Sequence, residues 1–116
     1  MQSIKSYTDI EQSRKLAEIL PLESADMCYR IVAYNPDDTH VYQPYCFVGT
    51  LEGDIYAWSL AALLGVLPQG YSLGNKKSNG KYYICMTCVK HDVIEYDEPI
   101  DACVNMIIRL HELKML

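Results

Sequence analysis

Apolar side chains recur at helical spacing near the start of the chain. Charged residues separate them, so that one side of the helix would be apolar and the other polar. Thr8 and Glu11 stand three residues apart, as in a capping box that begins a helix. Pro21 ends the segment, because the residue before a proline is disfavoured in the α conformation. The pattern predicts a first helix whose buried stripe is Ile10, Leu16, Ala17, Ile19 and Leu20.

Two strands are predicted after the first helix. Residues 27–34, MCYRIVAY, are rich in β-branched and aromatic side chains, which favour extended structure. The tetrapeptide NPDD at 35–38 predicts a turn, and residues 45–51, YCFVGTL, predict the second strand. His40 then falls in the loop between the strands, where a solvated position is more common than a functional site.

The second helix is apolar on nearly every side. Ser59 is a suitable N-cap, and Trp58 and Leu63 have the spacing of a hydrophobic staple. The helix ends before Pro68. A short helix without a polar side is typical of a central position that several other elements cover.

The C-terminal half predicts a hairpin followed by a long helix. Residues 71–89 contain two strand-like segments around a turn rich in glycine and asparagine. Pro99 suits the first turn of a helix that continues to Met115. All the elements together predict an α+β fold, with an antiparallel sheet of about four strands covered by three helices in the order αββαββα. At 116 residues the chain predicts a single domain, 1–116.

Two cysteines and a histidine follow one another at three-residue spacing at the end of this hairpin and just after it. Successive members of the set Cys85, Cys88 and His91 would point to opposite faces of a strand, so they do not converge on one metal ion. Structural zinc needs four converging ligands, and a redox cysteine pair needs a helix N-terminus. We therefore expect cysteines that pack as small apolar residues, with no metal, no cofactor and no disulfide.

Charge and composition exclude two classes of partner. The net charge is −5, and no block of lysine and arginine is present of the kind that nucleic-acid phosphates require. The longest apolar run, 55–67, is shorter than the roughly 20 residues of a membrane span. The first residues lack the apolar centre of a signal peptide, and the five cysteines are irregularly spaced. We expect a cytoplasmic protein with reduced thiols that binds neither nucleic acid nor membrane.

Tyrosine is used unusually often. The chain has ten tyrosines against one phenylalanine and one tryptophan, and tyrosine is enriched at protein interfaces. We predict a recognition surface near the first two strands, through which the chain associates with itself or with a host protein. Its members are Tyr29, Tyr34, Tyr42 and Tyr45. Arg30 and Arg109 are the arginines placed to line a pocket for an anionic small molecule, should the protein bind one.

The sequence has few of the residue patterns that are typical of catalytic sites. Cys103 and His111 share one side of the last helix, but helical rise separates them by about 12 Å, beyond the reach of a nucleophile and its base. Phosphate loops, dinucleotide-binding glycine motifs and nucleophile elbows are not found in the sequence. We lean against an enzyme, and a small hydrolase is the least favoured class.

Three segments resemble a set of small uncharacterised proteins from gut bacteria, their phages and other mobile elements. The segments are 7–27, 58–68 and 101–116, YTDIEQSRKLAEILPLESADM, WSLAALLGVLP and DACVNMIIRLHELKML. Small accessory proteins of phages often bind and neutralise a host component, so the resemblance implies a non-enzymatic binding protein of phage or mobile-element type. The alternative is a small-molecule binder that sequesters a nucleotide signal and so acts against host defence.

Overall fold

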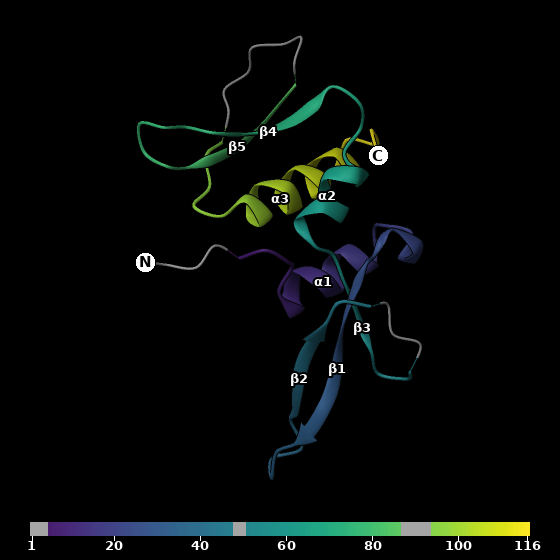
Figure 1. Ribbon diagram of the computed structural model, residues 1–116. Helices are drawn as coiled ribbons and strands as arrows, with labels where there is room; N and C mark the ends of the chain where they lie inside the picture. The colour runs from purple at the N-terminus through teal and green to yellow at the C-terminus, as the bar shows by residue number, and fades with distance from the viewer. Residues whose placement is uncertain (1–4, 48–50, 87–93) are drawn as a thin grey trace.

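The computed structural model describes residues 5–47, 51–86 and 94–116 of the chain (Figure 1). Within these residues it has the predicted α+β class, with three helices and antiparallel strands. The elements in chain order are α1 (Ile10–Ala17), a 3-10 turn (Leu22–Ser24), β1 (Met27–Tyr34), β2 (His40–Tyr45), β3 (Ile55–Ala57), α2 (Leu60–Val66), β4 (Tyr71–Asn75), β5 (Tyr82–Met86) and α3 (Pro99–Glu112).

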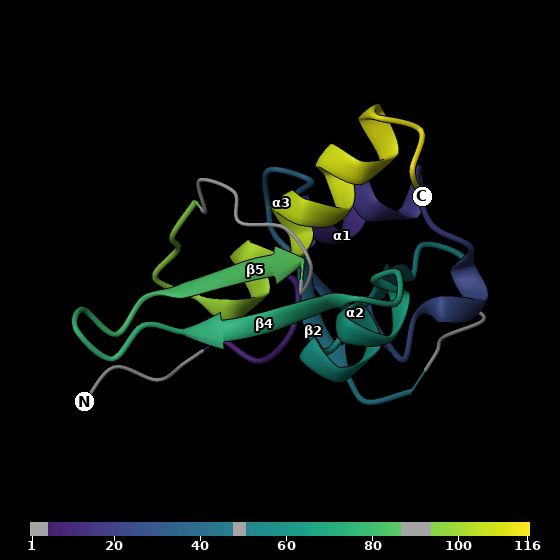
Figure 2. The ribbon, with the colours of Figure 1, turned by 90° about the horizontal axis from the view of Figure 1, so that it is seen from above.

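The strands form two sheets where one was predicted. The first has the order β2-β1-β3, with both pairs antiparallel. The short strand β3 was not predicted, and it pairs only with the first three residues of β1, Met27 to Tyr29. The second sheet is the hairpin of β4 and β5, which lies against α3 (Figure 2). The predicted order αββαββα is therefore wrong by one additional strand.

The predicted position of the second strand is also wrong. β1 has the predicted bounds, and the turn after it is present, but β2 spans His40–Tyr45. Cys46 and Phe47 do not continue the strand, and residues 48–50 of the predicted strand lie outside the described residues. The N–H of Asn35 donates to the carbonyl of Thr39 and closes the turn. Tyr34 and His40, the residues that flank this bond, therefore form the first pair of the hairpin. Turn closure sets the register of a hairpin, and here it outweighs the more apolar run that follows.

The cap of α1 lies one residue later than predicted. Asp9, and not Thr8, is the N-cap, because its carboxylate accepts from the N–H of Gln12 and the Gln12 side chain accepts from the N–H of Asp9. Thr8 is buried instead. Its hydroxyl accepts from the N–H of Trp58 and is hydrogen-bonded to the hydroxyl of Ser13. These bonds tie the beginning of α1 to the end of β3.

The main core lies between the three helices and the β4–β5 hairpin. Trp58 and Leu63, the predicted staple residues, are both fully buried in it, and Ser59 caps α2 as predicted. The next residue of α2, Leu64, is 38% exposed, so one side of this helix faces solvent while Leu63 packs into the core. α3 begins with Pro99 and contributes most of the remaining core: Ile100, Ala102, Cys103, Val104, Ile107 and Leu110.

β1 and β2 extend away from the helices as a projecting hairpin (Figure 1). A small second core of Met27, Tyr29 and Ala57 holds its base against Tyr7 and Ile10. The radius of gyration is 15.5 Å, against about 13 Å for a compact domain of this length. The elongated shape leaves the outer half of the hairpin away from both cores.

Candidate functional site

A β-bulge reorganises the side chains of the projecting hairpin. Ile31 pairs with Tyr42 and Ala33 pairs with Val41, so that Val32 is the extra residue on β1. A bulge adds one residue to one strand and so shifts the alternation of its side chains between the two faces. Beyond the bulge, the pair of Tyr34 and His40 therefore lies on the same face as the pair of Ile31 and Tyr42.

Three rings in contact follow from this register, and we call Tyr34, His40 and Tyr42 the aromatic stripe. The centroids of Tyr34 and His40 are 4.9 Å apart and those of His40 and Tyr42 are 6.0 Å apart, both edge to face. Such edge-to-face pairs are favourable beyond the area that they bury. Tyr42 packs on the small core, His40 is exposed, and Tyr34 is 71% exposed. The stripe therefore runs from the base of the hairpin into solvent.

Tyr29 was predicted on the recognition surface, and the structure places it in the small core. Only 7% of it is exposed, and its hydroxyl donates to the carbonyl of Thr8 at 2.6 Å. Burial, followed by the nearby Tyr7 and Asp9, raises the pKa of the Tyr29 hydroxyl to about 12. Its ring also contacts that of Tyr7 at 6.2 Å. Tyr29 anchors the hairpin and does not contribute to its exposed face.

The opposite face of the hairpin carries an ion pair. The Arg30 guanidinium donates from Nε and Nη2 to the two carboxylate oxygens of Asp54, at 3.1 and 2.9 Å. Hydrogen bonds from Arg30 are the main reason that the pKa of Asp54 lies below its usual value. The guanidinium also lies over the rings of Tyr45 and Phe47, at 5.9 and 5.2 Å from their centroids. Arg30 and Tyr45, two of the predicted surface residues, thus form a cation–π contact with each other.

Arg109 does not join the other predicted site residues. It belongs to the last turn of α3 and is exposed. Figure 1 shows α3 on the far side of the molecule from the β1–β2 hairpin. The structure therefore brings together Tyr34 and Tyr42 on one face of the hairpin and Arg30 and Tyr45 on the other. It does not gather the two arginines into one anion-binding wall.

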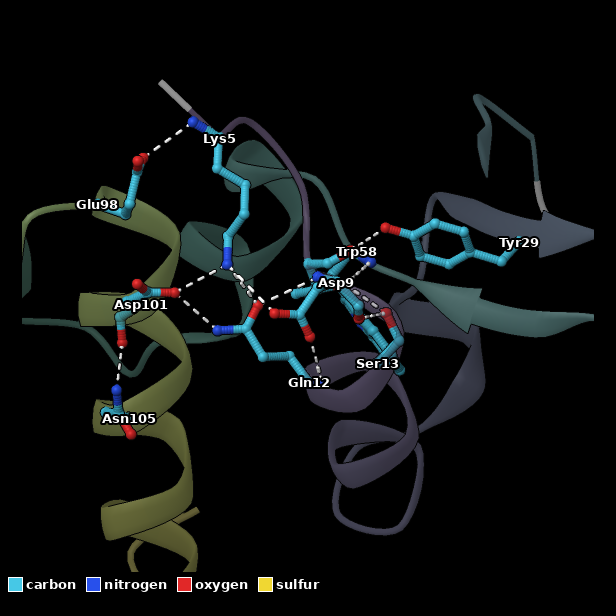
Figure 3. A network of polar contacts seen from close by, with 10 residues as sticks. Lys5, Asp9, Gln12, Ser13, Tyr29, Trp58, Glu98, Asp101 and Asn105 are labelled. Atoms are coloured by element: carbon cyan, nitrogen blue, oxygen red, sulfur yellow. Dashed lines mark hydrogen bonds and ion pairs between the residues drawn. The ribbon is translucent and has the colours of Figure 1, made fainter. Parts of the chain in front are cut away.

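A polar network around Lys5 is the largest cluster of charged groups seen in the described chain (Figure 3). The Lys5 ammonium donates to Asp101 at 2.9 Å and to Gln12 at 3.0 Å, and lies 3.5 Å from Asp9. Gln12 also donates to Asp101, and the Lys5 backbone N–H donates to Glu98. The network joins the N-terminal segment and the first turns of α1 and α3, which is a structural role.

Other polar and thiol side chains near the first two helices and in α3 also have structural roles. The indole of Trp58 donates to the Ser24 hydroxyl, and the carboxylate of Asp26 accepts from the backbone N–H and the hydroxyl of Ser59. Cys103 is fully buried, and burial raises the pKa of its thiol to about 11, which is unsuited to a nucleophile. Ser24 and Asp26, which follow α1, thus connect this segment to Trp58 and to Ser59, the N-cap of α2.

His40 lies on β2 and not in the predicted loop, and its ring contacts Tyr42 and not the carboxylate of nearby Asp37. The Asp37 carboxylate accepts from the hydroxyl and N–H of Thr39, and these bonds lower the pKa of Asp37. The Nδ1 atom of His40 instead lies 3.5 Å from the Tyr42 hydroxyl. His40 was not predicted as a site residue, because the second strand was predicted at residues 45–51, later in the chain than β2. The alternation in HVYQPY was the available signal.

The stretch that contains Cys85, Cys88 and His91 lies partly within the described residues. Cys85 lies on β5 with its sulfur 3.4 Å from the Ser72 hydroxyl, whereas Cys88 and His91 lie outside the described residues. In the part that the structure describes, no three His, Cys, Asp or Glu side chains are grouped to hold a metal ion. Over the same residues, no helix has the length and apolar character needed to cross a bilayer.

No family model, curated protein or solved structure matches this chain. The aromatic stripe on the projecting hairpin is therefore the feature from which we infer function.

Proposed function

We propose that this protein is a non-enzymatic binding protein, of the phage or mobile-element type that its sequence resembles, and that it contacts another polypeptide through the aromatic stripe. The observation that carries the proposal is the stripe itself: three rings in edge-to-face contact on a projecting hairpin, the outermost of which is 71% exposed. Tyrosine rings supply large contact area at a small cost in conformational entropy, and they dominate many interfaces.

The charged groups support a binding role over a catalytic one. Lys5 is bonded to Asp101, and Arg30 is bonded to Asp54. Catalytic acids and bases are poised to exchange protons with a substrate, whereas these groups satisfy one another. Sequestration of a nucleotide would need cations that are available to phosphate. Arg30 is held by Asp54 and covered by two rings, which makes this second class less favoured.

Native mass spectrometry of the protein as it is purified from expressing cells tests the proposal. We expect complexes whose added mass is that of a polypeptide, either a second chain of 13.2 kDa or a host protein. The variant Tyr34→Ser/Tyr42→Ser should lose these complexes. The matched control Gln43→Ser, on the opposite face of the same strand, should keep them.

Two results would argue against this function. An added mass of a few hundred daltons that survives in Tyr34→Ser/Tyr42→Ser would favour the sequestering class. Polypeptide complexes of equal abundance in the stripe variant and in the Gln43 control would place the contact surface elsewhere on the molecule.

A further inference from the structure

The chain exposes more surface than a compact monomer of its mass. Its accessible surface is 7771 Å², whereas a compact protein of 13.2 kDa exposes about 6400 Å². The surplus, roughly 1400 Å², exceeds the about 800 Å² that each partner buries in an interface of standard size. The projecting hairpin of Figure 1 contributes to this surplus. One standard interface on the hairpin would thus remove more than half of this surplus.

The charge distribution favours a second copy of the chain as the occupant of this surface. The protein carries a net charge of −5, so two copies repel one another at long range, and a contact surface without charged side chains adds no local repulsion to this. The aromatic stripe contains no aspartate, glutamate, lysine or arginine. The ion pair of Arg30 and Asp54 lies on the opposite face. A neutral aromatic surface is complementary to another of the same kind, and it offers no charge to a basic or an acidic partner.

The partner contacts the face of the hairpin and not its edge. β2 is the outer strand of the order β2-β1-β3, and an outer strand can pair with a further strand. Pro44 has no N–H to donate, and proline on an outer strand obstructs such pairing. The bulge at Val32 also breaks the regular ladder of β1. Side chains, and not backbone hydrogen bonds, would therefore make the contact.

The order of the rings defines the symmetry of the contact. His40 lies between Tyr34 and Tyr42, with centroid distances of 4.9 and 6.0 Å to the two tyrosines. In a twofold interface, a residue i that contacts j on the partner is matched by j contacting i. If two stripes lie antiparallel with the axis at their middle, His40 meets His40 of the second copy, and Tyr34 meets Tyr42 of the second copy.

From these observations we infer that the protein forms a twofold dimer in which the aromatic stripes of two copies pack face to face, with the axis passing close to His40. The inference rests on the proposed function, because it names the partner of the same surface. It predicts that a charge at position 40 meets an identical charge across the axis, which opposes dimer formation. Opposite charges at this position would attract each other and restore the dimer.

Sedimentation equilibrium of the full chain at micromolar concentrations tests the arrangement. We expect the wild-type protein to dimerise, and we expect His40→Lys and His40→Glu, each alone, to raise the dimer dissociation constant at least about tenfold. An equimolar mixture of the two variants should recover a dimer that contains one copy of each. His40 is exposed, so both variants should fold, which circular dichroism confirms independently. The matched control is Gln43→Lys, an exposed position on the opposite face, which should dimerise like the wild type.

The possible failures separate this inference from the proposed function. A wild-type protein that sediments as a monomer overturns the dimer, while the proposed function stands if native mass spectrometry shows a host polypeptide bound through the stripe. If His40→Lys and His40→Glu dimerise as tightly as the wild type, the proposed dimer geometry is wrong. Self-association then no longer supports the aromatic stripe as the contact surface. Weakened single variants whose mixture remains monomeric overturn the placement of the axis at His40.

Discussion

Shortening Leu63 to alanine should destabilise the protein far more than the same change at Leu64. The two leucines are adjacent in α2, yet Leu63 is fully buried in the main core and Leu64 is 38% exposed. Leu63→Ala removes three carbon groups from the core, at about 0.8 kcal/mol each for transfer. The cavity that remains adds to this cost, which brings the expected loss to about 3 kcal/mol, within the range of about 2–5 kcal/mol for buried leucines.

The control variant isolates burial from helix propensity. Leu64→Ala makes the same chemical change in the same helix, so any difference in propensity cancels, and we expect a loss below about 1 kcal/mol. Equilibrium unfolding in urea measures both. With a slope near 1.5 kcal/mol per molar for a chain of this size, Leu63→Ala should lower the midpoint by about 2 M. Equal losses in the two variants would refute the position of α2, since they would mean that both leucines are similarly buried.

Three further predictions concern single side chains. Tyr29→Phe should cost about 1 kcal/mol at neutral pH through the lost bond to the Thr8 carbonyl. Because the folded pKa of Tyr29 is raised from 10.0 to about 12, its contribution is present below pH 10 and is lost as the pH rises through 12. Urea midpoints across this range should therefore fall more steeply for the wild type than for Tyr29→Phe, and parallel curves would contradict the burial of the hydroxyl. Asp54→Asn should lower the midpoint at pH 7, and the difference from wild type should shrink as the pH falls below 3.8, through the lowered folded pKa of Asp54. The control Glu52→Gln, an exposed change in the same loop, should leave the midpoint unchanged. A midpoint difference between wild type and Asp54→Asn that stays constant with pH would count against the ion pair. A thiol reagent under native conditions should label exposed Cys46 and leave buried Cys28 and Cys103 unmodified, as peptide mapping would show; early labelling of Cys103 would contradict its place in the core.

Local signals in the sequence predicted much of the scaffold. The bounds of β1, the cap of α2 at Ser59, the burial of Leu63 and the start of α3 at Pro99 agree with the structure. Each depends on residues that are close together in the chain, such as a capping hydroxyl or a run of β-branched side chains. These features need no knowledge of how distant segments meet.

The parts that could not be predicted depend on distant contacts. β3 has only three residues, and it pairs with Met27 to Tyr29 of β1, which lie far from it in the sequence. Tyr29 and Tyr34 look alike in the sequence, and α1 covers the base of the hairpin but leaves its end open. The bulge at Val32 decides which tyrosines share a face, and the partner of Arg30 lies 24 residues away at Asp54. A propensity scale contains none of this information.

The most direct test of the central claim is photocross-linking from the aromatic stripe. A photoreactive phenylalanine derivative replaces Tyr34 in one sample and Gln43, on the opposite face of the hairpin, in another. If the stripe is the contact surface, irradiation should yield a polypeptide adduct from position 34, at the mass of two chains or of one chain and a host protein, and little from position 43. Equal adducts from both positions, or none from position 34, would contradict the claim that this face of the hairpin binds another polypeptide.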